Sequence, residues 1–564
     1  MKRKISRQQA KNYTKPKKFF RSSLVRSLVL GIVPAILTSV PVEAAENLII
    51  DYEGASISLN IDELETFARE GKVGDSVKIV VNRMKPEQQA EFRKALLMKG
   101  EKIDPMKINR FLRTPIGEEI LTQAGKLIRL QGSRNGKYAI RSAVYKAATD
   151  ADGLTIINFL RQFSKDPELN AKNLIQVANK VKDLIKDTKQ MTTEMKKLSS
   201  QEAAASKKVN FASLPDLRNP GKFGYNRITR TFNDRSRGRR LKVDIYSPKQ
   251  WRKGKTPVVI ASHGLASERK HFQKQAEHLA TYGYLVVAPQ HPGSDNKQFK
   301  DMLSGYAREI FELNEFIDRP LDVTYLLDEL EKQNQSNYQG KLDLSEVGVM
   351  GHSFGGYTAL ALAGAEIDFQ QLEKDCNQEI WDANLSLLLQ CRGLELERKT
   401  YNFRDPRVKA VIAVNPLNSS IFGPKGLSKI EIPVFLVAGT EDPATPALTE
   451  QILSFTWLRG EDNYLVLVRG LSHVDESRLE ESVGDLLKSI RTLDQPEEGL
   501  FESYGYAMIP AFFESYIDNS PNYRSYLQAS YAEYVSEKPF SMYLVQSSSS
   551  EALSRSLEDL RAER

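Results

Sequence analysis

Cysteine is scarce in this chain of 564 residues, which contains two cysteines and six histidines. The two cysteines, Cys376 and Cys391, lie close together, and no histidine stands near them. A structural zinc site needs four ligands of these types, so we expect no zinc site built on the two thiols. In an oxidising compartment a Cys376–Cys391 disulfide would form, and two buried, reduced cysteines are the alternative.

A membrane-spanning length of apolar sequence is also missing near the start of the chain. Residues 28–37 are apolar, but they fall short of the roughly 20 residues that a spanning helix needs, and Pro34 interrupts them. A basic block precedes this run, and small residues with Val42-Glu43-Ala44 follow it, which is the order of a secretory signal peptide. Residues 1–44 are therefore predicted to be a signal peptide that sends the chain to the periplasm or the cell exterior. An uncleaved anchor is the alternative.

Outside this segment the chain has no excess of positive charge. The whole sequence carries a formal charge of +8, and residues 1–44 hold ten basic residues against one acid, which leaves −1 for the rest. The sequence therefore offers no basic surface for nucleic acid. Peripheral association with the cell envelope stays open, and the sequence does not fix the oligomeric state.

Residues 45–198 contain no histidine and no cysteine, and their apolar spacing is mostly helical after a candidate hairpin at residues 48–59. We expect a small, mainly helical domain without catalytic residues. The polar, small residues 199–209 are predicted to be a linker.

Beyond residue 210 the pattern changes to strands that alternate with helices, which is typical of a mainly parallel sheet covered by helices. Several of the runs are almost continuous Val, Ile and Leu, as expected when both faces of a sheet are buried. The predicted strands are residues 240–246, 257–262, 285–289, 347–350, 408–414, 434–438 and 464–468. Residues 367–405 are predicted to be a cap insertion, with an apolar leucine cluster at residues 385–389; residues 497–517 are expected to be the last helix and residues 518–564 a C-terminal tail.

A nucleophile motif follows one of these strands. Gly351-His352-Ser353-Phe354-Gly355 fits G-x-S-x-G between a strand and a helix, where a sharp turn exposes the serine hydroxyl. The hydrolase order Ser, acid, His then predicts His473 as the base, because no other histidine follows Ser353. Asp442 is the favoured acid, and Glu441 and Asp475 are its rivals.

Two backbone N–H groups are predicted to bind the oxyanion, those of Phe354 and of Leu265 in the loop after residues 257–262. His263 in this loop is interpreted as structural. His291 and Ser294 follow the next strand, where substrate contact and turn formation are evenly balanced.

These residues identify a family resemblance. The segments His263-Gly264, His291-Pro292-Gly293-Ser294, Arg319-Pro320-Leu321-Asp322 and 351–356 resemble the α/β-hydrolase superfamily, and within it the platelet-activating-factor acetylhydrolase group and bacterial predicted dienelactone hydrolases. The resemblance covers residues 210–517 and implies an α/β-hydrolase fold. True dienelactone hydrolases have a cysteine nucleophile, whereas this chain has a serine. Residues 48–180 are similar to a domain of unknown function that precedes such hydrolases in cyanobacteria.

The leading hypothesis is an exported serine hydrolase that cleaves small or lipid carboxylic esters, with Ser353, Asp442 and His473 as its triad and no metal or organic cofactor. A serine peptidase of the prolyl-oligopeptidase type is the second hypothesis, although the N-terminal region lacks the length of a β-propeller. A non-catalytic envelope binding protein with a hydrolase fold is the third.

Overall fold

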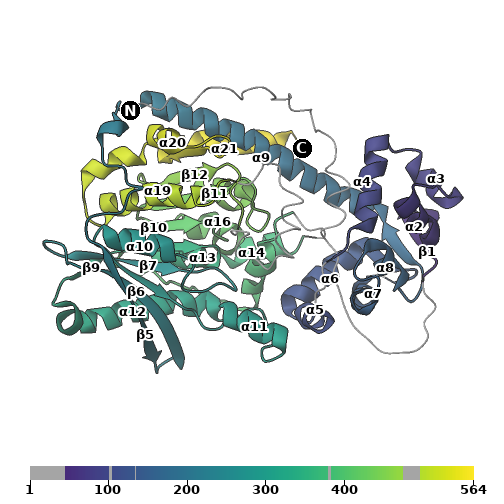
Figure 1. Cartoon of the computed structure of the whole chain (residues 1–564), viewed down its shortest axis with the longest axis horizontal. Coiled ribbons are helices and arrows are strands. Elements are labelled where there is room, and N and C mark those ends of the chain that lie inside the picture. Colours follow the sequence, from purple (N-terminus) through teal and green to yellow (C-terminus); the bar gives the residue numbers. More distant parts are fainter. Residues whose placement is uncertain (1–44, 101–103, 134, 379–382, 474–495, 564) are drawn as a thin grey trace, which may run out of the picture.

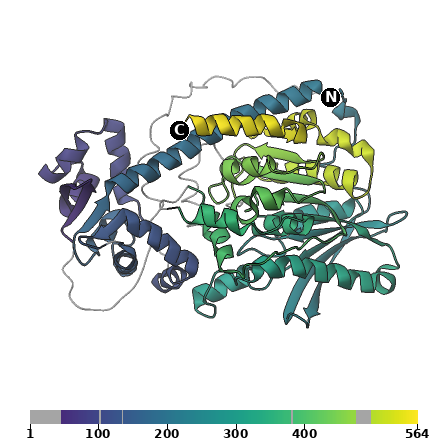
Figure 2. The same ribbon diagram turned by 180° about the vertical axis from the view of Figure 1, so that it is seen from behind.

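The computed structural model describes residues 45–563 except 101–103, 134, 379–382 and 474–495. The predicted signal peptide, residues 1–44, lies outside the described residues. Figures 1 and 2 show a smaller N-terminal domain beside a large sheet covered by helices, with one long helix reaching from the first to the second.

The N-terminal domain combines helices with a small sheet of strand order β2-β1-β4-β3. Its strands are β1 (Asn47–Tyr52), β2 (Ala55–Asn60), β3 (Ile128–Leu130) and β4 (Pro167–Asn170). Its helices are α2 (Ile61–Glu70), α3 (Asp75–Val81), α4 (Pro86–Leu97), α5 (Pro105–Leu112), α6 (Pro115–Leu127), α7 (Lys137–Thr149) and α8 (Ile156–Arg161). The predicted hairpin is confirmed, since β1 and β2 pair antiparallel around a turn in which Glu53 and Gly54 have positive φ.

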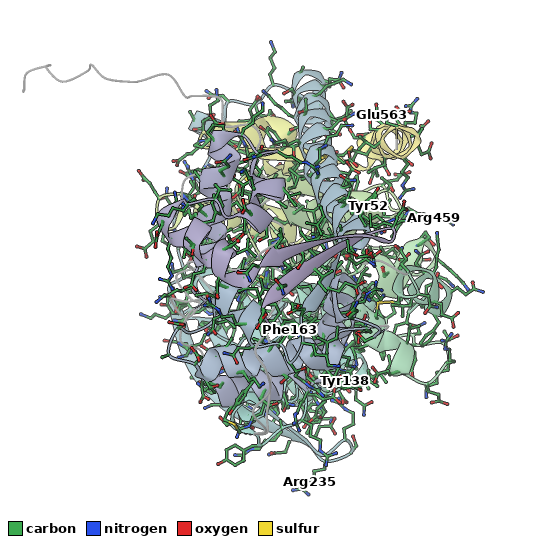
Figure 3. All side chains as sticks on the ribbon, turned by 90° about the vertical axis from the view of Figure 1, so that its right-hand side faces the viewer. Tyr52, Tyr138, Phe163, Arg235, Arg459 and Glu563 are labelled. Carbon is green, nitrogen blue, oxygen red and sulfur yellow. A yellow bond between two sulfur atoms is a disulfide. The ribbon has the colours of Figure 1, made fainter. Side chains whose placement is uncertain are left out.

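The helices of this domain enclose their own apolar core, to which Phe163 belongs. Figure 3 looks onto this domain, with Tyr52 and Tyr138 on its surface; these side chains are 50% and 70% exposed. The domain therefore has the core of an independent unit.

The second part is built on a nine-stranded sheet of order β13-β12-β11-β10-β9-β7-β8-β6-β5. The strands from β12 to β8 run parallel, and β13, β6 and β5 are antiparallel to their neighbours. Their bounds are β5 (Tyr225–Asp234), β6 (Arg239–Pro248), β7 (Thr256–Ser262), β8 (Leu285–Pro289), β9 (Leu342–His352), β10 (Val408–Val414), β11 (Val434–Gly439), β12 (Tyr464–Val468) and β13 (Met542–Gln546). All seven predicted strands are confirmed.

Helices cover both faces of the sheet, as the continuous apolar strands require. All residues of β7, β8 and β12 are buried. One core lies under α12 (Glu315–Tyr338), α13 (Phe354–Ala363), α16 (Ser419–Leu427) and α21 (Ser550–Ala562), and the other lies under α10 (Gln273–Thr281), α19 (Leu500–Tyr516) and α20 (Ala529–Val535). The predicted last helix corresponds to α19, but it is not the last element.

The predicted linker at residues 199–209 is wrong. Helix α9 (Ala171–Ala205) is continuous over 35 residues and contacts β13, α20 and α21. The segment Gln201–Ala205 is rich in Ala, Gln and Glu, which favour helix, so its small and polar composition did not indicate a flexible chain. Only the short stretch after Ser206 leads on to the 3-10 helix η1 (Phe211–Ser213).

The predicted C-terminal tail, residues 518–564, is wrong for most of its length. It forms the 3-10 helix η5 (Pro521–Leu527), then α20, the edge strand β13, the 3-10 helix η6 (Ser547–Ser549) and α21. Leu544 and Val545 are fully buried on opposite sides of the sheet, one in each core. The hydrolase part therefore extends to α21, because its sheet needs β13 to cover β12.

The insertion at residues 367–405 carries α14 (Phe369–Cys376), α15 (Leu387–Gln390) and the 3-10 helix η2 (Cys391–Glu395), and a disulfide joins Cys376 to Cys391. Helix α15 contacts α6 of the N-terminal domain, and α5 contacts α11 (Asn296–Ser304), where Arg110 Nη1 donates to the Leu303 carbonyl at 2.7 Å.

No helix in the described part of the chain has the length and apolar character needed to span a membrane.

Candidate active site

The G-x-S-x-G segment forms a sharp turn at the carboxyl end of β9. Ser353 lies between β9 and α13 with φ 56° and ψ −118°, a left-handed conformation that costs energy for any residue with a side chain. A Cβ on Gly351 would lie 2.0 Å from the Gly355 carbonyl oxygen, and one on Gly355 would lie 2.0 Å from that of Ser262. The two glycines are therefore required by the close approach of the backbone that holds Ser353 in this turn.

Loops after two further strands bring an imidazole and a carboxylate to the same serine. His473 follows β12, and its Nε2 lies 2.9 Å from Ser353 Oγ; Asp442 follows β11, and its Oδ2 lies 2.7 Å from His473 Nδ1. In the neutral imidazole, Nδ1–H then donates to the carboxylate, and Nε2 accepts from the serine hydroxyl. The structure thus brings the three predicted side chains together.

Asp442 is itself held by its own turn. Its Oδ1 accepts the backbone N–H groups of Ala444 and Thr445, each at 2.8 Å, and its Oδ2 accepts the Thr445 hydroxyl at 2.8 Å. The rival Asp475 lies outside the described residues. The contribution of Thr445 was not predicted, because a threonine three residues beyond an aspartate is a common turn pattern.

His352 lies closer to the site than its position in the turn suggested. Its ring centroid lies 4.8 Å from that of His473 and 4.7 Å from the stacked ring of His271. His352 also lies against the loop after β7, since a Cβ on Gly264 would be 3.2 Å from its Nδ1.

The two residues whose backbone N–H groups are predicted to bind the oxyanion lie near Ser353. Phe354 begins α13, and Leu265 follows Gly264, where a Cβ would meet the Ser353 Cβ at 3.2 Å. Among the described residues, no acceptor receives the backbone N–H of Leu265 or of Phe354. Both N–H groups are therefore free to bind a developing negative charge next to Ser353.

His291 and Ser294 do not reach a surface that a substrate could contact. Both side chains are fully buried. His291 Nδ1 lies 3.0 Å from Asp322 Oδ2 and its Nε2 lies 3.1 Å from Ser262 Oγ, whereas Ser294 Oγ donates to Glu315. The suggestion of substrate contact is therefore corrected: these residues belong to a polar network behind the loop that carries Leu265.

The charged side chains of this polar network pair with one another. Arg239 forms a two-pronged ion pair with Asp322, and hydrogen bonds from His291 and Arg239 lower the pKa of Asp322 against the opposing effect of burial. Burial raises the pKa of Glu315 to about 7 and lowers that of His291 to about 4. His291 is therefore neutral at neutral pH, so it donates Nδ1–H to Asp322 and accepts the Ser262 hydroxyl proton.

His263 has the structural role that we expected. Its Nε2 accepts the His291 backbone N–H at 3.0 Å, so its Nδ1 carries the proton and donates to the Gly264 carbonyl at 2.7 Å. Burial holds the pKa of His263 well below its ordinary value of 6.5.

One buried carboxylate gathers several of the hydrogen bonds that join the predicted cap insertion to the rest of the domain. Glu450, in the π-helix η3 (Leu448–Ile452), accepts hydrogen bonds from Asn384, Ser386 and Gln390 of the insertion and from Asn418 and Ser419 after β10. Of the predicted leucine cluster, Leu387 and Leu389 are buried in the core, and Leu385 is 43% exposed.

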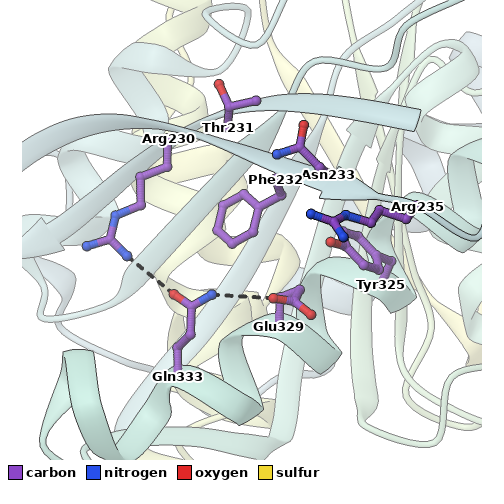
Figure 4. Close-up of a pocket in the computed structure, with 8 residues that line it drawn as sticks. All are labelled: Arg230, Thr231, Phe232, Asn233, Arg235, Tyr325, Glu329 and Gln333. Atoms are coloured by element: carbon purple, nitrogen blue, oxygen red, sulfur yellow. Dashed lines mark hydrogen bonds between the residues drawn. The ribbon is translucent and has the colours of Figure 1, made fainter. Parts of the chain in front are cut away.

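A hollow elsewhere on the surface has no connection with the serine. It lies between β5 and α12, at the outer edge of the sheet (Figure 4). Its lining residues are Arg230, Thr231, Phe232, Asn233, Arg235, Tyr325, Glu329 and Gln333. In the described ranges no group of three or more His, Cys, Asp or Glu side chains is arranged to hold a metal ion.

Two family models match the chain. One, described as alpha/beta hydrolase of unknown function (DUF1400), matches residues 44–169, which correspond to the N-terminal domain rather than to the nine-stranded sheet. The other, the chlorophyllase family, matches residues 219–373, from β5 through Ser353 to α14. No curated protein matches the chain significantly. With these matches, the mainly parallel sheet and the turn at Ser353, the chain belongs to the α/β-hydrolase superfamily and carries an N-terminal domain of unknown function.

Proposed function

We propose that this hydrolase cleaves carboxylic esters through an acyl-enzyme formed on Ser353. The observation that carries the proposal is the continuous hydrogen-bonded series from Ser353 Oγ to His473 Nε2 at 2.9 Å and from His473 Nδ1 to Asp442 Oδ2 at 2.7 Å. Such a series activates a hydroxyl that is otherwise a weak nucleophile.

In the first half of the reaction, Ser353 Oγ attacks the ester carbonyl carbon while His473 Nε2 takes the hydroxyl proton. The carbonyl π electrons move to the oxygen, whose negative charge is bound by the N–H groups of Phe354 and Leu265. Collapse of this intermediate breaks the bond to the alcohol, which leaves with the proton returned by His473. In the second half, water repeats the same steps on the acyl-enzyme and releases the acid.

The insertion supports a substrate with an apolar acyl group. Leu385 is 43% exposed and Leu388 is partly buried, whereas Leu387 and Leu389 pack in the core and are not available to a ligand. We propose a small ester or a lipid ester as the substrate, as in the platelet-activating-factor acetylhydrolase group that the motifs resemble. No feature of the described residues favours the peptidase or the binding-protein hypothesis over this one.

We further propose that the enzyme acts outside the cytoplasm. Residues 1–44 have the pattern of a signal peptide, and the Cys376–Cys391 disulfide is a bond that persists in oxidising compartments.

Labelling with a fluorophosphonate probe tests the proposal. The wild type should capture the probe covalently and hydrolyse p-nitrophenyl acetate, and Ser353→Ala should abolish both, because only an activated serine reacts with the phosphorus atom. Ser345→Ala is the matched control, since Ser345 lies on the same strand but bonds only within its own turn with Asp343. A folded wild type that neither labels nor hydrolyses esters contradicts the proposal.

A further inference from the structure

Arg319 is a buried cation outside the proposed reaction, and it contacts both segments that carry the oxyanion donors. Its side chain is fully buried in α12. We propose that Arg319 is a positioning residue that aims the backbone N–H of Leu265 at the reacting carbonyl and holds Phe354 beside it. The inference rests on the proposed function and identifies what preorganises its oxyanion hole.

The first contact fixes the direction of one donor. Arg319 Nη1 donates to the His263 carbonyl at 2.6 Å, and Nη2 donates to the Gly264 carbonyl at 3.3 Å. The Gly264 carbonyl and the Leu265 N–H belong to one planar trans peptide group and point in opposite directions. Because Arg319 holds the carbonyl on its own side, the N–H of Leu265 must face the opposite side.

The nucleophile lies next to this peptide group. Gly264 lies so close to the turn that a Cβ would be 3.2 Å from Ser353 Cβ and 3.2 Å from His352 Nδ1. His263 Nδ1–H also donates to the Gly264 carbonyl, at 2.7 Å, so this oxygen has two donors and the peptide group cannot flip without losing both. The peptide is therefore set before a substrate arrives, which is the condition for effective oxyanion binding.

The second contact holds the other donor residue. The Arg319 guanidinium carbon lies 4.4 Å from the centroid of the Phe354 ring, which is fully buried. A guanidinium over an aromatic face is attracted by the ring electrons, strongly so where water is excluded. One planar group thus links the loop after β7 to the first residue of α13.

Arg319 is kept charged and oriented by its own partners. Its Nε donates to Ser294 Oγ at 2.9 Å, and Ser294 in turn donates to Glu315, which lies 3.6 Å from Arg319 and pairs with Arg239. Burial lowers the pKa of Arg319 to about 10, so the guanidinium is still protonated at neutral pH. The segments at residues 291–294 and 319–322 therefore both belong to the network that holds the Arg319 guanidinium in place.

The test compares Arg319→Lys with Arg237→Gln in the full chain. A lysine keeps the charge but loses the planar fork and the ring stacking. Arg237 is the matched control, because it pairs with Asp322 of the same helix at 2.9 Å and, among the described residues, forms no hydrogen bond or ion pair with the loop at residues 263–265. Four quantities are measured: kcat and KM for p-nitrophenyl acetate, the inhibition constant of a trifluoromethyl ketone that forms a tetrahedral oxyanion on serine, the pH profile of kcat/KM and the thermal midpoint.

We expect Arg319→Lys to lower kcat by about 10²-fold, in the range for loss of one oxyanion donor, with little change in KM. Affinity for the trifluoromethyl ketone should fall in parallel with kcat/KM, while the acid limb of the pH profile keeps its midpoint because Ser353, His473 and Asp442 are untouched. Arg237→Gln should lower only the thermal midpoint.

A folded Arg319→Lys with wild-type kcat overturns the inference, and so does a lower kcat with unchanged ketone affinity, which would indicate a merely structural role. If Arg319→Lys does not fold, Ser294→Ala replaces it, since it removes the acceptor of Arg319 Nε; unchanged kcat and ketone affinity in that variant also overturn the inference. A wild type without labelling or hydrolysis is a different result, which removes the proposed function and this inference with it.

Discussion

At the residue scale, His291 should reduce the stability of the fold at low pH, because it is buried as a neutral ring. It is fully enclosed, and it faces the carboxylate of Asp322 as well as the guanidinium groups of Arg319 and Arg239. Burial, assisted by both arginines, outweighs the attraction of Asp322 and lowers its pKa to about 4. Protonation of this residue would break the acceptor contact with the Ser262 hydroxyl.

Stability should therefore fall on acidification, and His291 should account for part of the fall. Between about pH 6.5 and pH 4 the unfolded chain binds a proton at residue 291 that the folded chain does not, so the free energy of unfolding decreases as pH falls. The slope due to this residue is at most about 1.4 kcal/mol per pH unit. The free energy of unfolding, measured with urea between pH 4.5 and pH 6, should change less steeply with pH in His291→Gln than in the wild type.

The control for this prediction is the interval from pH 8 to pH 9, where His291 is neutral in both states and the free energy of unfolding should depend equally on pH in the two proteins. Equal slopes below pH 6 as well would show that residue 291 does not titrate differently on folding.

Among single residues, the sequence identified those whose order along the chain is set by the reaction. Ser353, Asp442 and His473 could be selected because the motif marks the serine and only one histidine follows it. The roles of Arg319 and of the pair His291 and Ser294 could not, because they depend on which carbonyls and carboxylates the folded loops bring within 3 Å. Burial of a polar side chain is a property of the tertiary structure, and its local sequence does not reveal it.

At the element scale, apolar strands were predictable and amphipathic or polar ones were not. β12 is a continuous apolar run whose predicted bounds match the structure, whereas β5 consists mostly of polar residues and is only partly buried. β13 is a short apolar run within a polar segment, so only its pairing with β12 identifies it as a strand. The length of α9 was missed for the converse reason, because helix-favouring residues were interpreted as a flexible segment.

The insertion at residues 367–405 is joined to the rest of the domain through Glu450 and Gln390. The Glu450 carboxylate accepts from three side chains of the insertion, and Gln390 of α15 accepts the backbone N–H groups of Ser420 and Ile421. The insertion is therefore fastened to the loop after β10 by buried hydrogen bonds, whose donors would be left unsatisfied without the carboxylate.

Replacement of Glu450 by Gln should loosen this element. The NH₂ group of the glutamine would face side chains that are themselves hydrogen-bond donors. We therefore expect a loss of about 2 kcal/mol in the free energy of local opening. Trypsin cleavage after Arg392, which is buried in η2, should then become about 30-fold faster, since about 1.4 kcal/mol corresponds to tenfold. The rate of appearance of the cleaved chain on a reducing gel measures this effect.

Glu431→Gln is the control, because Glu431 forms an exposed ion pair with Arg404 and such pairs contribute little. If cleavage after Arg392 is as slow in Glu450→Gln as in this control, the carboxylate does not hold the insertion.

At the scale of the whole molecule, α9 connects the two parts of the chain as one continuous helix. It begins at the end of β4 in the N-terminal domain and lies across β13, α20 and α21 of the hydrolase part (Figures 1 and 2). Near its end, Ser199 Oγ accepts the Leu544 N–H at 3.2 Å, and Glu202 accepts the Gln546 N–H at 3.1 Å and the Ser549 hydroxyl at 2.6 Å.

Glu202→Ala should weaken this attachment. The N–H of Gln546 would lose its acceptor, at a cost of about 1–2 kcal/mol, so its hydrogen exchange should accelerate by about tenfold or more. Glu194→Ala on the same helix is the control, since Glu194 pairs only locally with Lys197. Exchange measured by mass spectrometry on peptides that contain β13 separates the two; equal protection in both variants would contradict the role of Glu202.

The same contacts determine how this molecule behaves toward other copies of itself. A terminal strand of a sheet normally offers a row of unused amide donors, onto which a foreign chain can add. Here Ser199 and Glu202 occupy alternate donors along β13. A strand from a second copy could not pair with those amides, so addition of a foreign strand at this edge of the sheet is disfavoured.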